Sequence, residues 1–204
     1  MRAKSSISNA LAASLAFILA CTLLGCSGVG QERSSAAPEA EPIPVAELEP
    51  AEVVRIIDGD TLIVRMSDGS EERVRLIGID APESKSPDEE ENCPEGEQAE
   101  ANLRETLPKG ERVWLSKDTS ERDRYGRLLR YIWLEKPAGE TASSQEFCSK
   151  CLNARLVVGG WAQAKRYPPD TAAADLLEAL GISAEAQGLG VSAKWSETQS
   201  QASK

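Results

Sequence analysis

Carboxylates and guanidiniums gather in a few short segments of this 204-residue chain. The segment Arg75-Leu-Ile-Gly-Ile-Asp80-Ala-Pro-Glu83 places one guanidinium and two carboxylates within nine residues. A hard divalent cation could bind Asp80, a phosphate could bind Arg75, and Glu83 could activate a water molecule. Together these groups have the composition of a hydrolytic site for a phosphate ester.

Two other segments could complete such a site. Asp60 follows a turn glycine in Asp58-Gly-Asp60 and offers a second hard oxygen ligand. Arg127 ends the turn Asp123-Arg-Tyr-Gly-Arg127, where Gly126 permits a backbone conformation that other residues avoid. Phosphodiester hydrolysis builds negative charge on the phosphate oxygens, and one preorganised donor to that charge is typically worth about 3 to 4 kcal/mol.

Each of these residues also has a structural interpretation. Asp60 could simply form a turn, and Arg75 could form a salt bridge or pack its stem on neighbouring isoleucines. Glu83 could be one more solvated carboxylate, and Arg127 a surface charge with Tyr125 packed beside it. No single residue distinguishes the structural interpretation from the chemical one. The distinction rests on the combination of these residues and on the strands and helices that position them.

The chain's apolar patterns predict five strands and about three helices. The Asp68-Gly69 pair is a strong hairpin signal between two of the strands. The expected strands are 53–57, 61–66, 73–79, 112–116 and 128–134. The expected helices are 96–107, 152–158 and one that Asp170 or Thr171 caps, with Gly181 as a potential interruption.

These elements predict an α+β, mainly β fold: a five-stranded barrel of oligonucleotide/oligosaccharide-binding (OB-fold) type with about three helices. Five short strands are too few for a large sandwich, and we expect the barrel to be antiparallel. In this arrangement Asp60 precedes the second strand, Asp80 ends the third and Arg127 precedes the fifth.

The N-terminus reads as an export signal. Basic residues Arg2 and Lys4 precede an apolar run over 10–24, which is shorter than the roughly 20 residues of a membrane span. Leu23-Leu-Gly-Cys26 resembles a bacterial lipoprotein cleavage box, which implies removal of residues 1–25 and lipidation of Cys26. The alternatives are modification at Cys21 or an ordinary signal peptide.

Residues 26–50 are expected to form a disordered, acidic, proline-rich tether. Residues 51–197 are expected to form one domain, followed by a loose tail over 198–204. We therefore expect an exported protein at the cell envelope, anchored by lipid to the outer face of a bacterial membrane and monomeric.

Composition narrows the chemistry. The formal net charge of −10 argues against a general nucleic-acid binder, so phosphate chemistry must rest on a few local cations. The chain contains no histidine, which excludes histidine-based triads and His-ligated zinc. Cys93, Cys148 and Cys151 provide too few ligands for a Cys₄ zinc site, and an exported protein permits a disulfide within Cys148–Cys151 or from one of them to Cys93.

The combination of motifs resembles the staphylococcal nuclease (thermonuclease) family. The matching segments are Ile57-Asp-Gly-Asp-Thr61, Arg75 to Glu83 and Asp123 to Arg127, with weaker likeness at 152–162 and 183–195. The resemblance implies Ca²⁺-dependent hydrolysis of DNA and RNA, single-stranded or denatured, with 3′-phosphate ends.

The resemblance also implies a role for each matching residue. The calcium carboxylates correspond to Asp60 and Asp80, and a backbone carbonyl ligand corresponds to Ala81. The general base corresponds to Glu83. The phosphate-binding arginines correspond to Arg75 and Arg127, and Tyr125 and Tyr167 correspond to substrate-binding tyrosines.

Two features depart from the family pattern. The loop after Glu83 is acidic rather than lysine-rich, which should disfavour a polyanion. The late tyrosine loop keeps only Tyr167, so base stacking there should be reduced. The rival hypothesis is therefore a catalytically weak module that uses the same fold to bind nucleic acid or protein.

Overall fold

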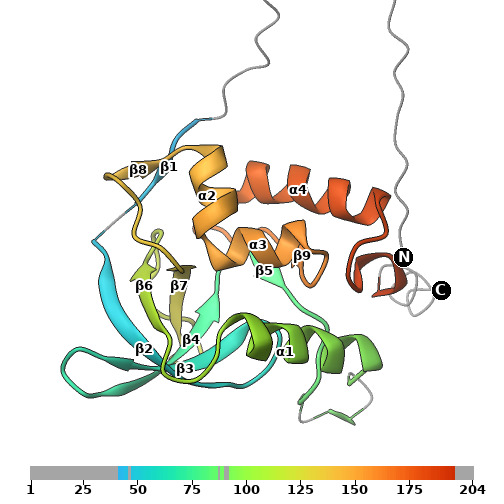
Figure 1. Ribbon diagram of the computed structural model, residues 1–204, viewed down its shortest axis with the longest axis horizontal. Helices are drawn as coiled ribbons and strands as arrows, with labels where there is room; N and C mark the ends of the chain where they lie inside the picture. The colour runs from blue at the N-terminus through green and yellow to red at the C-terminus, as the bar shows by residue number, and fades with distance from the viewer. Residues whose placement is uncertain (1–40, 46, 87, 90–91, 196–204) are drawn as a thin grey trace, which may run out of the picture. The chain divides into compact units, whose positions relative to one another are not determined.

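The computed structural model describes residues 41–195 apart from 46, 87, 90 and 91. Five strands close into a barrel in the order β2-β3-β4-β7-β6 (Figure 1). Their bounds are β2 Glu49–Ile56, β3 Thr61–Met66, β4 Glu71–Leu76, β6 Arg112–Ser116 and β7 Leu128–Trp133. The expected mainly β, OB-type barrel is confirmed, and closure leaves it without a free sheet edge.

The barrel is not wholly antiparallel. β4 and β7 pair in parallel, with Arg75 opposite Leu129 and Leu76 opposite Arg130, while the other neighbouring pairs are antiparallel. The chain makes a crossover through α1 (Pro94–Thr106) and β6 before it returns to β4, as parallel pairing requires. The expectation of an antiparallel barrel is corrected at this one pair.

The strand expected over 73–79 is two elements. β4 ends at Leu76, and β5 (Ile79–Asp80) begins after a turn at Gly78, whose φ is +77°. A side chain at position 78 would also press on Leu177 in the packed interior. The turn redirects the chain, so Asp80 lies in a separate two-stranded sheet with β9 (Gln163–Ala164).

The ordered domain begins before residue 51. β1 (Ile43–Pro44) pairs with β8 (Thr141–Ala142), Ile43 and Val45 are buried, and β2 already begins at Glu49. The expected tether boundary at Pro50 is therefore wrong, because two apolar residues within the proline-rich stretch are enough to anchor it. Residues 1–40 lie outside the described residues, as do 196–204.

Four named helices accompany the barrel. α2 (Ser144–Lys150), α3 (Leu152–Val158) and α4 (Ala174–Ala186) lie together, whereas α1 lies apart across the lower strands (Figure 1). α3 has the predicted bounds. α2 is absent from the helices that the sequence predicted, and Ser143 caps it by accepting a bond from the Glu146 amide. A short helical turn follows at 192–195.

The expectations for α4 are wrong in two respects. Its N-cap is Ala173, without a side-chain cap, and the helix passes through Gly181 without a break. Asp170 instead accepts hydrogen bonds from the amides of Thr119 and Ser120, at 3.0 and 2.7 Å. Asp170 thus supports a loop of the barrel rather than the start of the helix.

The core joins the barrel to α2 and α3. Phe147 of α2 makes edge-on contacts with Tyr131 and Trp133 of β7, with ring centroids 5.4 and 5.6 Å apart. Asn153 of α3 is fully buried: it accepts from the Ile132 amide and donates to the carbonyl of Ile77 at 2.8 Å. These contacts hold β7 against the turn that leads to Asp80.

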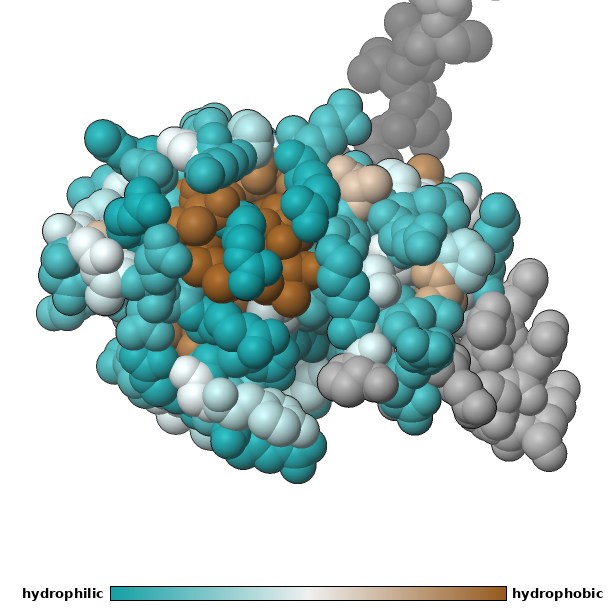
Figure 2. Space-filling view, turned by 90° about the horizontal axis from the view of Figure 1, so that it is seen from below, coloured by the Kyte–Doolittle hydropathy of each residue, from teal (hydrophilic) through white to brown (hydrophobic). Residues whose placement is uncertain are grey.

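On the face shown in Figure 2, hydrophobic side chains gather in one patch on the barrel half of the domain, ringed by hydrophilic ones. No helix among the described residues is long and apolar enough to cross a membrane.

Candidate active site

One cleft brings the predicted site residues together. It has a volume of about 850 Å³ and is lined by Asp60, Arg75, Asp80, Glu83 and Arg127, with Tyr125 and Tyr167 at other points of its wall. These residues come from the turn before β3, from β4 and β5, from the loop after β5, from the turn before β7 and from the loop after β9. The sequence prediction that they form one site is thus consistent with the geometry.

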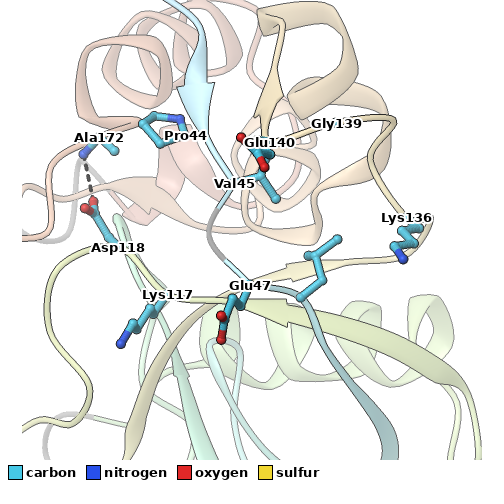
Figure 3. Close-up of a pocket in the computed structure, with 10 residues that line it drawn as sticks. Pro44, Val45, Glu47, Lys117, Asp118, Lys136, Gly139, Glu140 and Ala172 are labelled. Atoms are coloured by element: carbon cyan, nitrogen blue, oxygen red, sulfur yellow. Dashed lines mark hydrogen bonds between the residues drawn. The ribbon is translucent and has the colours of Figure 1, made fainter.

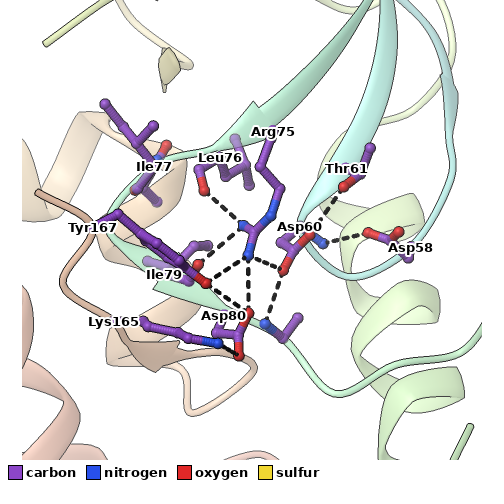
Figure 4. Close-up of polar contacts among 12 residues, drawn as sticks. Asp58, Asp60, Thr61, Arg75, Leu76, Ile77, Ile79, Asp80, Lys165 and Tyr167 are labelled. Atoms are coloured by element: carbon purple, nitrogen blue, oxygen red, sulfur yellow. Dashed lines mark hydrogen bonds and ion pairs between the residues drawn. The ribbon is translucent and has the colours of Figure 1, made fainter. Parts of the chain in front are cut away.

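Arg75 is the centre of the polar network (Figure 4). Its Nη1 donates to the carbonyls of Leu76 and Ile79 at 2.7 and 3.0 Å. Its Nη2 lies 3.0 Å from Asp60 Oδ2 and 2.9 Å from Asp80 Oδ1. Because only 10% of the Arg75 side chain is exposed, the guanidinium is held in one orientation.

Asp60 is buried and has three polar partners. Its Oδ2 accepts from the Ala81 amide at 3.0 Å and forms an ion pair with Arg75, and its Oδ1 accepts from the Thr61 hydroxyl at 3.0 Å. Burial raises the pKa of Asp60 to about 7, with the positive charge of Arg75 opposing that rise. Burial therefore disfavours the charged form of Asp60, and a bound cation would stabilise that form.

Asp80 has a second cation that the sequence prediction missed. Its Oδ2 accepts from Lys165 Nζ at 2.7 Å, and its Oδ1 accepts from the Tyr167 hydroxyl at 3.2 Å as well as from Arg75. The Tyr167 ring lies between the two cations, 5.4 Å from Lys165 Nζ and 5.8 Å from the Arg75 guanidinium carbon. Tyr167 thus lines the cleft as expected, but its contacts here are to the carboxylate network.

Arg127 is positioned by its own turn. Its Nε donates to Asp123 Oδ2 at 2.6 Å, while Asp123 Oδ1 accepts from the Arg127 amide at 2.9 Å. The φ of Gly126 is +80°, as the expected turn requires. Arg127 Nη1 lies 3.4 Å from the Thr61 hydroxyl, which itself donates to Asp60. A chain of polar contacts therefore links the second arginine to the first carboxylate.

Tyr125 projects from the same turn into solvent, with 67% of the residue exposed. Its ring lies between two guanidiniums, 4.7 Å from that of Arg124 and 5.5 Å from that of Arg127. An exposed ring beside two guanidiniums at the wall of the cleft is suited to stacking against a nucleobase.

Glu83 lies on the exposed rim, and helix α1 positions its backbone. The Cys93 amide donates to the Glu83 carbonyl at 3.1 Å. A Cβ at Gly96 would come within 2.1 Å of that same oxygen, so only glycine permits the helix to approach this closely. The candidate base is thus exposed to water on a backbone that the helix holds in place.

A buried carboxylate braces the next two residues. Glu100 of α1 accepts from the Ser84 hydroxyl at 2.8 Å and from Lys85 Nζ at 2.5 Å, and it also pairs with Arg104. Asp88 and Glu89 of the acidic loop are exposed, and Glu90 and Glu91 lie outside the described residues. The bracing therefore acts at the end of the loop nearest to Glu83.

The donors fit a hard cation in part. Asp60 and Asp80 each place one oxygen within 3.0 Å of the same Arg75 nitrogen, so the two carboxylates converge on one point. Ala81 lies beside that point, with its amide on Asp60. In the described part of the chain, no group of three or more His, Cys, Asp or Glu side chains could hold a metal. Calcium takes six to eight oxygens, so carbonyls, water and substrate would have to supply most of them.

Other predicted features do not add a second site. Cys93, Cys148 and Cys151 are all free thiols, so neither expected disulfide pairing is present among the described residues. Burial raises the pKa of the Cys151 thiol to about 12, which makes it unreactive. Cys26 lies outside the described residues.

A smaller pocket of about 580 Å³ lies between the N-terminal segment and the loops after β6 and β7 (Figure 3). Its charges are of mixed sign, and Asp118 at its edge already accepts from the Ala172 amide at 2.8 Å. Its charged groups do not converge on a common point as those around Arg75 do.

Comparison with known proteins identifies relatives of the chain. The thermonuclease of Staphylococcus intermedius is 36% identical over 139 residues, which cover 68% of this chain and 73% of that protein. The thermonuclease of Staphylococcus hyicus is 37% identical over 58% of this chain and 60% of that protein. The endonuclease YncB of Bacillus subtilis (strain 168) is 38% identical over 40% of this chain and 37% of that protein.

A family model agrees with these matches. The model described as "Staphylococcal nuclease homologue" covers residues 73–197, which include Arg75, Asp80, Glu83 and Arg127. The matched span runs from within β4 to beyond α4, and Asp60 lies before it. The chain therefore belongs to the staphylococcal nuclease family.

Proposed function

We propose that the protein is a calcium-dependent nuclease that hydrolyses phosphodiester bonds of DNA, RNA or both and leaves 3′-phosphate ends. The names of its relatives, thermonuclease and endonuclease, support the nuclease activity. The observation that carries the proposal is the convergence of two carboxylates on one nitrogen of Arg75, in a cleft that also contains Glu83 and Arg127.

The side chains divide the chemistry among them. Asp60 and Asp80 would hold the calcium ion, which when bound supplies positive charge to a phosphate oxygen. Glu83, on the solvent-exposed rim, accepts a proton from the attacking water. Arg75 and Arg127 donate hydrogen bonds to the phosphate oxygens as negative charge builds on them, and their fixed orientation avoids reorganisation during the reaction.

The charges of the cleft wall support a polyanionic substrate despite the acidic composition. Arg73 and Arg124 line the cleft and form no ion pair within the part of the chain that the structure describes. With Tyr125 beside them, they offer contacts to phosphates and a base away from the scissile bond. The acidic residues of the loop after Glu83 should weaken binding. They follow the segment 75–83 in the chain, whereas Arg73 precedes it.

The decisive experiment is a cleavage assay of the purified protein on denatured DNA and on RNA, with Ca²⁺ and then with excess chelator. We expect cleavage that requires Ca²⁺ and falls at least about 100-fold in Glu83→Gln, in line with the worth of a general base. Glu52→Gln is the matched control, because Glu52 is exposed on β2 and its one ion pair among the described residues is with Arg65.

The products separate the enzyme from its alternatives. Fragments that change mobility after phosphatase treatment at their 3′ ends would support the proposed cleavage position. Nucleic-acid binding without cleavage above the Glu83→Gln level would contradict the proposal and favour a binding module with a nuclease fold.

We further propose that the protein acts at the cell envelope through a lipid on Cys26, on the basis of the sequence Leu23-Leu-Gly-Cys26. Labelling of cells with a radioactive fatty acid should mark the wild-type chain and not Cys26→Ser. Cys21→Ser is the matched control and should remain labelled; loss of label only in Cys21→Ser would contradict the assignment.

A further inference from the structure

Lys165 is the one member of the carboxylate network that the sequence motifs did not predict. It follows β9, and its amide donates to the Gly78 carbonyl at 2.9 Å, which extends the β5–β9 pairing to the turn before Asp80. This pairing places its side chain beside Asp80, where Nζ lies 2.7 Å from Oδ2 (Figure 4). The Lys165 ammonium thus forms an ion pair with an oxygen of Asp80, a candidate calcium ligand.

The three groups that contact Asp80 are held unequally. Arg75 is buried and is secured by two backbone carbonyls in addition to its two carboxylates. The Lys165 side chain is 50% exposed, and in the part of the chain that the structure describes it forms one ion pair, with Asp80. A cation that binds Asp80 must displace or share one of these partners, and of the two positively charged ones Lys165 is the one whose departure costs less.

A displaced Lys165 would remain at the mouth of the cleft. Its ammonium is a mobile point charge on a flexible stem, and the Tyr167 ring, which lines the cleft, lies 5.4 Å from it. A phosphate of a bound nucleic acid is the anion that could receive it there. Release from Asp80 and capture by phosphate would then be one exchange.

We propose that Lys165 is an exchangeable counter-cation: it neutralises Asp80 in the metal-free protein and moves to a substrate phosphate when a divalent cation takes Asp80. The inference rests on the proposed function, since it requires Ca²⁺ and a phosphate ligand. Its consequence is positive coupling, because each ligand removes the partner that Lys165 would otherwise keep. By linkage, bound Ca²⁺ raises the affinity for the phosphate ligand by the same factor as the bound phosphate ligand raises the affinity for Ca²⁺.

The test is calorimetric titration of the full chain with Ca²⁺, with and without a nucleoside 3′,5′-bisphosphate, which has phosphates but no phosphodiester to cleave. In Lys165→Met, Ca²⁺ alone should bind roughly two- to fivefold more tightly, since a half-exposed ion pair no longer competes. The bisphosphate should then increase Ca²⁺ affinity less than it does in the wild type. Lys136→Met, which removes an equal charge from an exposed loop, should change neither value.

The outcomes are distinguishable. Unchanged Ca²⁺ affinity in Lys165→Met would overturn the exchange while leaving the proposed nuclease intact. Tighter Ca²⁺ binding with undiminished coupling would also overturn it, because loss of a nearby positive charge would then suffice. Absence of Ca²⁺ binding in the wild type, with or without bisphosphate, would overturn the calcium proposal and this inference together. Thermal unfolding midpoints within about 2 °C of the wild type would show that the lysine variants are folded.

Discussion

Two buried arginines lie on neighbouring strands of the barrel and have opposite surroundings. Arg75 of β4 lies at the wall of the cleft, and its Nη2 atom forms ion pairs with two aspartates. Arg130 of β7, with 2% of its side chain exposed, pairs with Glu49 and Glu121, whose side chains are about half exposed. Arg130 also donates to the carbonyls of Glu121 and Leu129, and its Nε has no partner among the described residues.

The difference shows which feature identifies a functional arginine. Burial and ion pairing are common to both residues. Only at Arg75 are the carboxylates themselves partly withdrawn from water and directed to a single point, so that their charge is available to a ligand. At Arg130 the carboxylates extend from solvent toward a guanidinium that secures β7 to the loop at Glu121 and to β2.

The same substitution at both positions should separate the two roles most strongly at Arg75. Arg75→Lys should lower kcat by about 10²- to 10³-fold, because an ammonium cannot reproduce the bidentate, fixed donor geometry. Single-turnover cleavage with saturating Ca²⁺ measures this. Arg65→Lys on the exposed side of β3 is the matched control, and equal losses in both would refute the distinction.

Asn153 links the backbone of β7 at Arg130 to the turn that follows β4, because its amide donates to the carbonyls of Ile77 and Arg130. Asn153→Ala leaves these groups and the Ile132 amide without their partner, so we expect a loss of about 3 kcal/mol in the free energy of unfolding. Urea denaturation measures it. Asn92→Ala, which alters an amide in the loop after Glu83, should cost far less; similar costs would argue that Asn153 is not a tie between the strands.

Arg130→Lys should lower the free energy of unfolding by about 2 kcal/mol, since several hydrogen bonds to a buried guanidinium are lost. The kcat at a temperature where the variant is folded should remain within about threefold of wild type. Among the described residues, the Arg130 side chain forms its hydrogen bonds and ion pairs with Glu49, Glu121 and Leu129, none of which is proposed for catalysis. A fall in kcat comparable to that of Arg75→Lys would remove the contrast between the two sites.

The smallest expected effect is a pH dependence at Glu121. Its hydrogen bond from Arg130 lowers the pKa of this carboxyl below the ordinary 4.5. Because the folded-state pKa is the lower one, the stabilisation is present above about pH 4.5 and is lost as pH falls through the folded-state value. Glu121→Gln should therefore be less stable than wild type at pH 7, by at most about 1 kcal/mol given its exposure, and the difference should vanish in acid. A difference that persists at pH 3 would contradict this.

The sequence could predict those parts of the molecule that local patterns determine. The hairpin at Asp68-Gly69, the bounds of α3 and the turn before Arg127 each depend on a few adjacent residues, and their predictions are confirmed. The motif residues were expected to lie together, and Asp60, Arg75, Asp80, Glu83 and Arg127 line one cleft. The family resemblance carried information about their proximity that periodicity did not.

The remaining features depend on contacts between distant segments. Helix α2 lies in a polar stretch and is stabilised through Phe147 against β7, which no local pattern showed. Lys165 is adjacent to Asp80 only because β5 and β9 pair across more than eighty residues. Arg130 occupies an inward position in a strand of apolar residues. A buried charge there is explained only by its ion pairs with Glu49 and Glu121, which lie in other segments of the chain.

The hydrogen bond from the Cys93 amide to the Glu83 carbonyl closes the acidic loop at its base. The two ends of the loop are therefore held together at the start of helix α1, and the hydrogen bonds between Asn92 and Ser86 support them. Such a loop can be exchanged as a cassette, because a replacement of equal length meets the same two attachment points. A lysine-rich insert could thus be grafted to adjust the affinity for polyanions while the position of Glu83 is kept.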